Sequence, residues 1–156
     1  MVEADPNPSK GHLLAPTEAA HLITTHEPRQ EPPDIYLNEH LMDLQFSPCC
    51  NMLALSQVTG HVRVYAYGES HMTQVLDLTQ HAESVRSIAF SPHGNILYCA
   101  SKDKSFSVVS NGRVEGQLEG AHAESINKIA HLEDEVLIAT GDDDGAVKIW
   151  DLRMAA

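Results

Sequence analysis

The chain has 156 residues, of which 42% are hydrophobic and 21% are charged, a balance that suits one globular domain with its own core. Its 22 acidic residues against 10 lysines and arginines give a formal net charge of −12, which disfavours direct binding to nucleic acid. The sequence offers neither an apolar run of bilayer length nor a secretory signal at its N-terminus. We therefore expect a soluble intracellular protein with no membrane partner.

Residues 1–33 hold six of the eight prolines and few large apolar side chains. Such a composition cannot offset the entropy cost of ordering a chain, so it predicts a disordered, proline-rich tail. Thr17 can cap a short helix that reaches His26 within this tail. No function is assigned to the tail.

From Asp34 onward the pattern changes to short runs of β-forming residues separated by turn signals such as Asn111-Gly112. This pattern predicts an all-β chain built from hairpins. The predicted strands are, in chain order, Leu41 to Phe46, Met52 to Ser56, Val62 to Tyr67, Met72 to Leu78, Val85 to Phe90, Ile96 to Ala100, Ser105 to Val109, Val114 to Leu118, Ile126 to Ala130, Val136 to Thr140 and Ala146 to Trp150.

The three cysteines, Cys49, Cys50 and Cys99, are odd in number and lack the spacing of a zinc or redox motif. We expect unpaired structural thiols in a reducing compartment, with metal binding at Cys49 and Cys50 as the weaker alternative. No cofactor is expected.

Internal repetition is the strongest single feature of the sequence. The segment from His81 to Ala89 recurs as the segment from His122 to Ala130, 41 residues later. A fainter copy lies upstream, where Phe46-Ser47-Pro48 precedes Phe90-Ser91-Pro92 by 44 residues. A period of about 40 to 45 residues with four short strands per copy is typical of β-propeller blades. The chain thus divides into a tail (1–33), three repeats (34–78, 79–118 and 119–153), of which the first is divergent, and a C-terminal end (154–156).

The third copy resembles the WD-repeat β-propeller family, because His122 is followed by Thr140-Gly141 and then by Asp144-Gly145 and Trp150-Asp151. The resemblance implies a structural tetrad in which indole, hydroxyl, imidazole and carboxylate form a buried hydrogen-bonded chain. Its members are expected to be His122, Thr140, Asp144 and Trp150.

The other two copies keep less of this pattern. In the second copy His81 and Asp103 remain, but Cys99 and Val109 replace the hydroxyl and the indole. The first copy has no tetrad, and the corresponding positions are Leu37, Leu55, Thr59 and Tyr65.

Two other kinds of site share these residues. A histidine, a hydroxyl and an aspartate are also the parts of a hydrolytic triad, but their recurrence at the repeat spacing favours blade architecture, and we expect no catalytic residue and no enzyme. A calcium loop is suggested by Thr140, Asp142, Asp144, Gly145 and Asp151, yet its twelfth position lacks the bidentate glutamate. The acidic clusters 133–135 and 142–144 are solvated turns or, as a sharper hypothesis, a docking surface for basic partners.

The segment from Asp134 to Gly145, with Trp150-Asp151-Leu152-Arg153 after it, is similar to the eukaryotic WD-repeat-containing protein fifty-five family. Ser101-Lys102-Asp103-Lys104 in the preceding copy adds to this likeness. The resemblance implies a non-catalytic interaction scaffold in nucleolar ribosome biogenesis and ribosomal RNA processing. It also implies pre-ribosomal proteins as partners, and residence in the nucleus and nucleolus, with the cytoplasm as a second location.

Trp150, Asp151 and Arg153 carry a second resemblance, to the WDxR motif of substrate receptors for cullin-four ubiquitin ligases. The alternative function is therefore that of a substrate receptor, with a ligase adaptor as the protein partner. The motif is short, and Trp-Asp ends a strand in many propellers, so the structural reading is preferred.

Propellers close with four to eight blades, and three copies cannot close a ring. We therefore expect this chain to be a fragment or a truncated isoform of a longer protein. Open sheet edges and uncovered blade faces predict that the chain alone is aggregation-prone or oligomeric.

Overall fold

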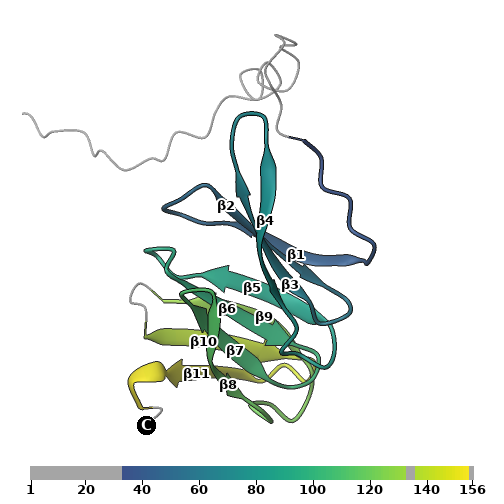
Figure 1. Cartoon of the computed structure of the whole chain (residues 1–156). Helices are drawn as coiled ribbons and strands as arrows, with labels where there is room; N and C mark the ends of the chain where they lie inside the picture. Colours follow the sequence, from purple (N-terminus) through teal and green to yellow (C-terminus); the bar gives the residue numbers. More distant parts are fainter. Residues whose placement is uncertain (1–32, 133–135, 155–156) are drawn as a thin grey trace, which may run out of the picture. The chain divides into compact units, whose positions relative to one another are not determined.

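The computed structural model describes residues 33–132 and 136–154, and the predicted tail and its helix lie outside these residues, except for residue 33. The described part is all-β, apart from one 3₁₀ turn at Leu152–Met154, and the predicted fold class is confirmed. Eleven strands form three antiparallel sheets that follow one another along the chain (Figure 1).

Within each sheet the strands lie in the order in which they occur along the chain. The first sheet contains β1 (Leu41–Phe46), β2 (Met52–Gln57), β3 (Val62–Tyr67) and β4 (Met72–Leu78). The second contains β5 (Val85–Phe90), β6 (Ile96–Ser101), β7 (Phe106–Ser110) and β8 (Arg113–Leu118). The third contains β9 (Ile126–His131), β10 (Leu137–Asp142) and β11 (Val147–Asp151).

All eleven predicted strands are present, with bounds that shift by one or two residues at seven of them. The sequence also predicts an early strand from Asp34 to Leu37, the one that completes the last blade of a closed propeller, and this prediction is wrong for the described chain, because residues 34–37 belong to no strand. The third sheet has three strands, so β11 is an open edge, and its Val147 and Ile149 are 72% and 62% exposed. The described sheets do not close into a ring, as predicted, and self-association of the chain stays a prediction.

Two apolar clusters hold neighbouring sheets together. The first joins residues of β2 and β3 to Val85, Ile88 and Leu97 of the second sheet. The second joins Tyr98 and Phe106 to residues of β9 and β10, including Ile126 and Ile129. Aliphatic side chains dominate both clusters, as a chain with few aromatic residues requires.

Polar side chains of β1 add a second link between the first two sheets. The Asp43 carboxylate accepts a hydrogen bond from the Ile88 backbone N–H at 3.0 Å, and the Gln45 side-chain carbonyl accepts one from Phe90 N–H at 3.2 Å. Two N–H groups on the open edge of β5 are thereby bonded to side chains instead of to another strand. No described helix has the length and apolarity needed to cross a membrane.

Candidate functional site

The turn between the second and third strands of each sheet has the same backbone structure three times. Its fourth residue donates an N–H to the carbonyl of its first residue and has a positive φ. The three pairs are Gly60 (φ 91°) with Gln57, Lys104 (φ 70°) with Ser101, and Gly145 (φ 82°) with Asp142. At Gly60 a side chain is also excluded by space, because a Cβ atom would lie 2.3 Å from the carbonyl oxygen of His81.

Two of these turns bond directly to the linker that enters the inner strand of their own sheet. Lys102 N–H donates to the Ser84 carbonyl at 2.9 Å, and Asp143 N–H donates to the Ser125 carbonyl at 3.0 Å. We call this end of the sheets the turn face and define it by the turns 57–61, 101–105 and 142–146 and the linkers 79–84 and 119–125. It lies on the right in Figure 1, opposite the loops that join β5 to β6 and β9 to β10.

In the third sheet a buried histidine of the linker anchors a hydrogen-bonded chain. His122, which is 3% exposed, contacts Thr140 Oγ1 through Nε2 at 2.6 Å and Asp142 Oδ2 through Nδ1 at 2.8 Å. The indole N–H of Trp150 donates to the same Thr140 hydroxyl at 2.7 Å. Strands β10 and β11 and the linker are therefore tied together at one point.

The donors of this chain follow from the chemistry of its members. With neutral His122, Nδ1–H donates to Asp142, Nε2 accepts from the Thr140 hydroxyl, and that hydroxyl accepts from Trp150, so every polar group is satisfied. The hydrogen bond from His122, together with the backbone N–H groups of Ala146 and Asp144, lowers the pKa of Asp142 although burial opposes the shift. Asp142 is thus ionised and acts as the acceptor at neutral pH.

The expected tetrad is wrong at one position, because the structure places Asp142 and not Asp144 against His122. Asp142 is the last residue of β10 and points toward the linker. Asp144 lies two residues further into the turn, is exposed, and donates its backbone N–H to Asp142 at 3.2 Å. The 41-residue offset carries Asp103 onto Asp144, but the two sheets use carboxylates from different positions of the turn.

The second sheet has a network of its own around His81, which is 4% exposed. Its Nδ1 lies 3.1 Å from Asp103 Oδ2 and 3.0 Å from Ser105 Oγ, and its Nε2 lies 2.9 Å from Ser107 Oγ. Ser105 donates its hydroxyl to Asp103 Oδ1 at 2.5 Å, and Ala82 N–H donates to Asp103 Oδ2 at 3.0 Å. The hydroxyl that seemed lost at Cys99 is supplied by Ser107 on the adjacent strand.

Burial sets the titration of this network. Desolvation lowers the pKa of His81 although Asp103 opposes the shift, so the imidazole is neutral at pH 7. Burial works to raise the pKa of Asp103, but hydrogen bonds from Ser105 and the interaction with His81 lower it overall. Burial also raises the pKa of Cys99 to about 12, against a hydrogen bond with Ser107, which makes this thiol unreactive.

Ser105 and Ser107 were missed because the 41-residue alignment compares only positions that are equivalent in sequence. Ser107 lies directly across from Cys99 in the β6–β7 pairing, where Lys148 lies across from Thr140 in the third sheet. The available sequence signal was the spacing of the two serines, because residues two apart in an extended segment lie on the same face, and both are 1% exposed or less.

The first sheet has neither network. Leu55 is buried and apolar, and the Tyr65 hydroxyl donates to Gln74 of β4 at 3.2 Å. Gln57 occupies the strand-end position of Asp142 and is fully buried, with its amide donating to the Glu39 carbonyl at 3.5 Å. Leu37 is half-buried, and Thr59 is an exposed residue of the turn.

Trp150 also joins the second and third sheets. Its ring lies 5.2 Å from that of Phe106 of β7, with Lys148 Nζ 5.7 Å from its centroid. Beyond β11, Arg153 binds the Asp151 carboxylate through Nε at 2.9 Å and Nη2 at 2.6 Å. The Arg153 guanidinium of the WDxR sequence therefore binds Asp151 of the same motif. The Arg153 side chain stays 63% exposed.

The other sequence-derived metal candidates are not assembled into sites. Within residues 33–132 and 136–154, no group of three or more histidine, cysteine or acidic residues could hold a metal ion. The carboxylates of the calcium-like loop serve other groups, Asp142 binding His122 and Asp151 binding Arg153. Cys49 and Cys50 are exposed free thiols, and Cys99 is a buried one.

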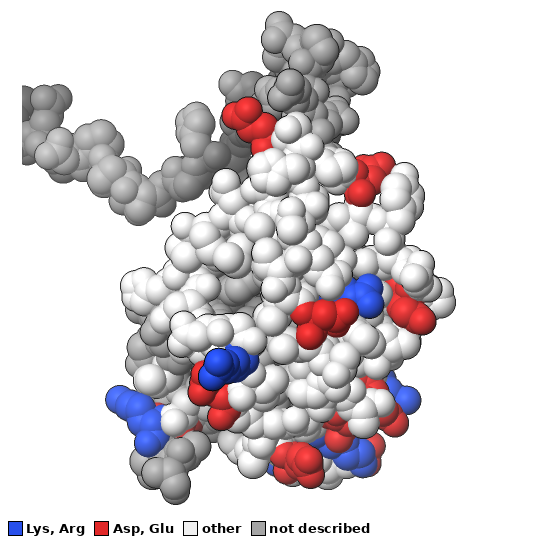
Figure 2. Space-filling model, in the orientation of Figure 1, with Lys and Arg blue, Asp and Glu red and all other residues white. Residues whose placement is uncertain are grey.

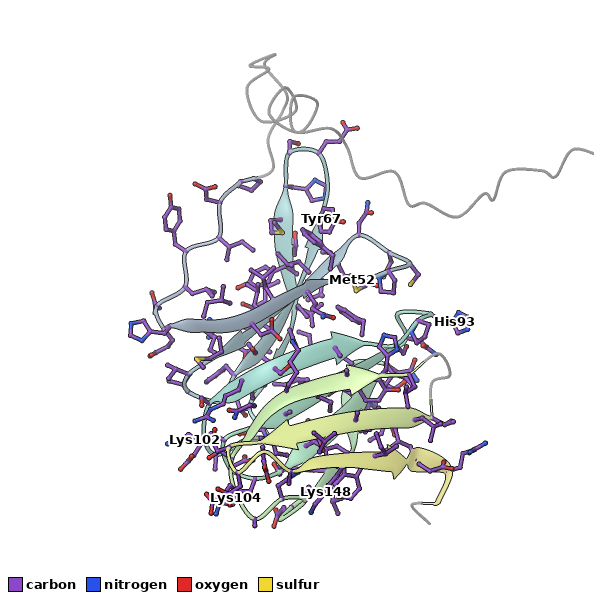
Figure 3. The ribbon with its side chains drawn as sticks, turned by 180° about the vertical axis from the view of Figure 1, so that it is seen from behind. Met52, Tyr67, His93, Lys102, Lys104 and Lys148 are labelled. Atoms are coloured by element: carbon purple, nitrogen blue, oxygen red, sulfur yellow. The ribbon has the colours of Figure 1, made fainter. Side chains whose placement is uncertain are left out.

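Charges of both signs lie next to one another on the turn face. Lys102 pairs with Glu83 at 3.3 Å and Lys104 with Glu124 at 3.6 Å. Figure 2 shows adjoining red and blue side chains near the lower end of the described part, and Figure 3 shows Lys102 and Lys104 at the turn face. Both lysines of the second turn therefore form ion pairs with neighbouring glutamates.

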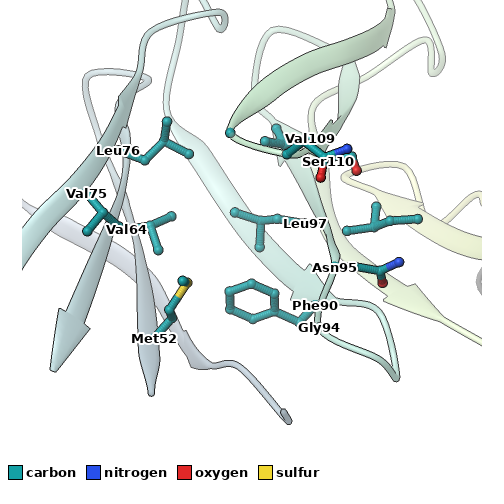
Figure 4. A pocket seen from close by; sticks show the side chains of 13 residues that line it. Met52, Val64, Val75, Leu76, Phe90, Gly94, Asn95, Leu97, Val109 and Ser110 are labelled. Carbon is teal, nitrogen blue, oxygen red and sulfur yellow. The ribbon is translucent and has the colours of Figure 1, made fainter. Parts of the chain in front are cut away.

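An apolar groove of about 300 Å³ opens between the first and second sheets (Figure 4). Met52, Val64 and Leu76 face Phe90 and Leu97 across it, and Asn95 and Ser110 lie at its side. The groove continues the first apolar cluster outward to solvent.

Comparison with known families finds the repeat predicted from the sequence. The family model for the "WD domain, G-beta repeat" (WD40) matches residues 72–110 and 113–151. Each matched segment begins at the outer strand of one sheet, β4 or β8, and ends with the third strand of the next sheet.

Curated relatives named "WD repeat-containing protein 55 homolog" resemble most of this chain. The protein from Drosophila persimilis is 38% identical over 129 residues, which are 81% of this chain and 25% of the relative. The protein from Drosophila mojavensis is 36% identical over 139 residues, 88% of this chain and 27% of the relative. The chain thus spans about a quarter of the length of these relatives.

Among solved structures, Chaetomium thermophilum Sqt1 bound to the N-terminus of the ribosomal protein L10 has a similar fold. Its TM-score is 0.68 at 25% identity, over 74% of this chain and 32% of that protein. A second structure of Sqt1 gives a TM-score of 0.67, again at 25% identity, over 72% of this chain and 31% of that one.

Proposed function

Because the chain belongs to the WD40-repeat family, we propose that it is a non-catalytic protein-interaction scaffold that acts in nucleolar ribosome biogenesis. The turn face carries this proposal. Three equivalent turns present exposed residues from a rigid base, since the buried histidines behind two of them fix the linkers and the strand ends. Binding residues are often found on loops that a rigid scaffold positions.

The chemistry of the histidine networks supports a structural role for them. A nucleophile must reach a substrate at the mouth of a pocket. Thr140 is 1% exposed, and its hydroxyl is occupied by His122 on one side and Trp150 on the other. The same holds for Ser107, which is fully buried between His81 and Gln80.

The link to ribosome biogenesis rests on similarity. The relatives are homologs of WD repeat-containing protein 55, and the similar Sqt1 structure is bound to the N-terminus of a ribosomal protein. We carry over to this chain a protein partner of the ribosomal or pre-ribosomal class. Because the chain covers about a quarter of the relatives, this partner is proposed for the protein that contains these repeats.

The test is depletion of the protein that carries this sequence, followed by pulse-labelling of precursor ribosomal RNA and rescue with a tagged copy. We expect precursor RNA to accumulate, the tagged copy to lie in the nucleolus, and nuclease-treated captures to contain pre-ribosomal proteins. A Thr140→Val copy, in which the third sheet is destabilised, should rescue RNA processing less well than the unchanged copy. Cytoplasmic residence with normal RNA processing would contradict the proposal.

A further inference from the structure

A polar pocket of about 380 Å³ opens on the turn face at the second sheet. It lies where the linker 80–82, the turn 103–105 and the segment 117–120 at the end of β8 come together. Its volume is within the range of small-ligand sites. The pocket adjoins the His81 network, because Asp103 and Ser105 belong to both.

Several hydrogen-bond donors of the pocket wall are used within the protein. The side-chain amide of Gln80 donates to Ser107 Oγ at 3.0 Å, and that of Gln117 donates to Ser105 Oγ at 3.0 Å. Ser105 gives its own hydroxyl proton to Asp103. Each of these two amides keeps its carbonyl oxygen and one N–H, so the pocket wall still offers acceptors to a ligand. The Oε1 atom of Gln80 is buried and accepts no hydrogen bond within the described part of the chain.

The pocket also carries negative charge that no lining residue balances. Asp103 and Glu119 are its charged residues, and Lys, Arg and His are absent from its lining among the described residues. Lys102 and Lys104, which flank Asp103 in the sequence, pair with Glu83 and Glu124. Lys148 donates from Nζ to the carbonyl of Ala121, next to Gly120 of the lining. His81, behind Asp103, is neutral at pH 7. The ligand that fits is therefore a cation with several donors.

We propose that this pocket binds the guanidinium group of an arginine side chain presented by a basic segment of a partner protein. The arginine fork has five N–H donors in a plane, so it can engage acceptors from different elements at once. Glu119 is exposed at the pocket and free to supply the carboxylate, while Asp103 adds charge from a fixed position. The overall charge of −12 attracts a basic segment. This inference rests on the proposed scaffold function and specifies the partner's chemistry.

The test is a titration of the ¹⁵N-labelled full chain with N-acetyl-arginine amide, followed by NMR. We expect shift changes that cluster at the amides of Ala82, Ser105 and Gly120 and at the side-chain amide of Gln117. N-acetyl-citrulline amide, which has the same shape without the charge, is the matched ligand. It should leave these signals in place.

Two charge-matched variants locate the site. Glu119→Gln should weaken arginine binding about three- to fivefold, the size of one exposed ion pair. Glu115→Gln removes the same charge from an exposed position of β8 outside the pocket, and its binding should be unchanged. Equal losses in the two variants, equal binding of citrulline or of N-acetyl-lysine amide, or shifts that cluster elsewhere would overturn the proposal.

This experiment separates the two proposals from each other. If the chain does not bind arginine, the pocket proposal is wrong, and the scaffold function is still tested by ribosomal RNA processing and localisation. Normal RNA processing with intact arginine binding at this pocket would contradict the nucleolar function and leave the pocket standing.

Discussion

The second and third sheets bury a histidine at the same place and satisfy it with different residues. In the third sheet the hydroxyl comes from the middle strand (Thr140) and the carboxylate from the end of that strand (Asp142). In the second sheet the hydroxyl comes from the neighbouring strand (Ser107) and the carboxylate from the turn (Asp103). The requirement is that a buried imidazole has an acceptor on Nδ1 and a hydroxyl on Nε2, and several backbone positions can meet it.

The largest effect should come from removing the carboxylate of the third sheet. Asp142→Ala leaves His122 Nδ1 and the N–H groups of Ala146 and Asp144 without their acceptor, and a lower melting temperature is expected by thermal unfolding. Asp144→Ala is the matched control, because its exposed carboxylate lies outside the network. If the control unfolds earlier than Asp142→Ala, the assignment of Asp142 is wrong.

The next effect distinguishes the sources of the hydroxyl. Thr140→Val keeps the shape of the side chain but removes the hydroxyl partner of His122 Nε2 and of the Trp150 indole N–H, and we expect a loss of about 3 kcal/mol in the free energy of unfolding. The same change at the equivalent position of the second sheet, Cys99→Val, should alter it by less than about 1 kcal/mol. Urea denaturation measures both. Similar losses of unfolding free energy in Thr140→Val and Cys99→Val would show that both sheets take the hydroxyl from the same position.

Ser107→Ala should cost about 2 kcal/mol in the same measurement, because His81 Nε2 and the amide of Gln80 both lose their partner. Its counterpart in the third sheet is Lys148→Ala. Lys148 is exposed and donates from Nζ to the Ala121 carbonyl, so a loss of about 0.5 kcal/mol is expected there. A larger loss for Lys148→Ala than for Ser107→Ala would show that Ser107 does not supply the essential hydroxyl of the second sheet.

The smallest effect concerns pH. The pKa of His81 is lower in the folded chain than its ordinary 6.5, so below pH 6.5 the unfolded chain binds more protons and the folded chain loses stability. This contribution is present above pH 6.5 and is lost as the pH falls from 7.5 to 5.5. Asp103 does not interfere, since its lowered pKa confines its effect to pH values below about 4.

Urea denaturation at the two pH values checks this slope. His81→Gln has no imidazole to protonate, and it should reduce the pH dependence even though the variant is less stable. An unchanged slope in His81→Gln would assign the pH dependence to another group.

The fold could be predicted from the sequence because strand patterns and repeats are local signals. All eleven strands were predicted, and the resemblance to WD repeats is confirmed by the family match. The networks were predicted only in part, because hydrogen-bond partners are selected in three dimensions. Asp142 and Asp144 are both acidic turn residues, and only the end of β10 determines which one reaches His122. Ser107 could have been found from the pairing of β6 with β7, which a comparison of repeats does not contain.

The matched repeats are out of phase with the sheets, since residues 72–110 start in the first sheet and end in the second. A segment that contains one matched repeat therefore does not contain one complete sheet. Each repeat contributes its first strand to the sheet of the preceding repeat. The sheet that holds its other three strands is completed by the first strand of the following repeat. A substitution where β3 pairs with β4 therefore affects a sheet that two neighbouring repeats share.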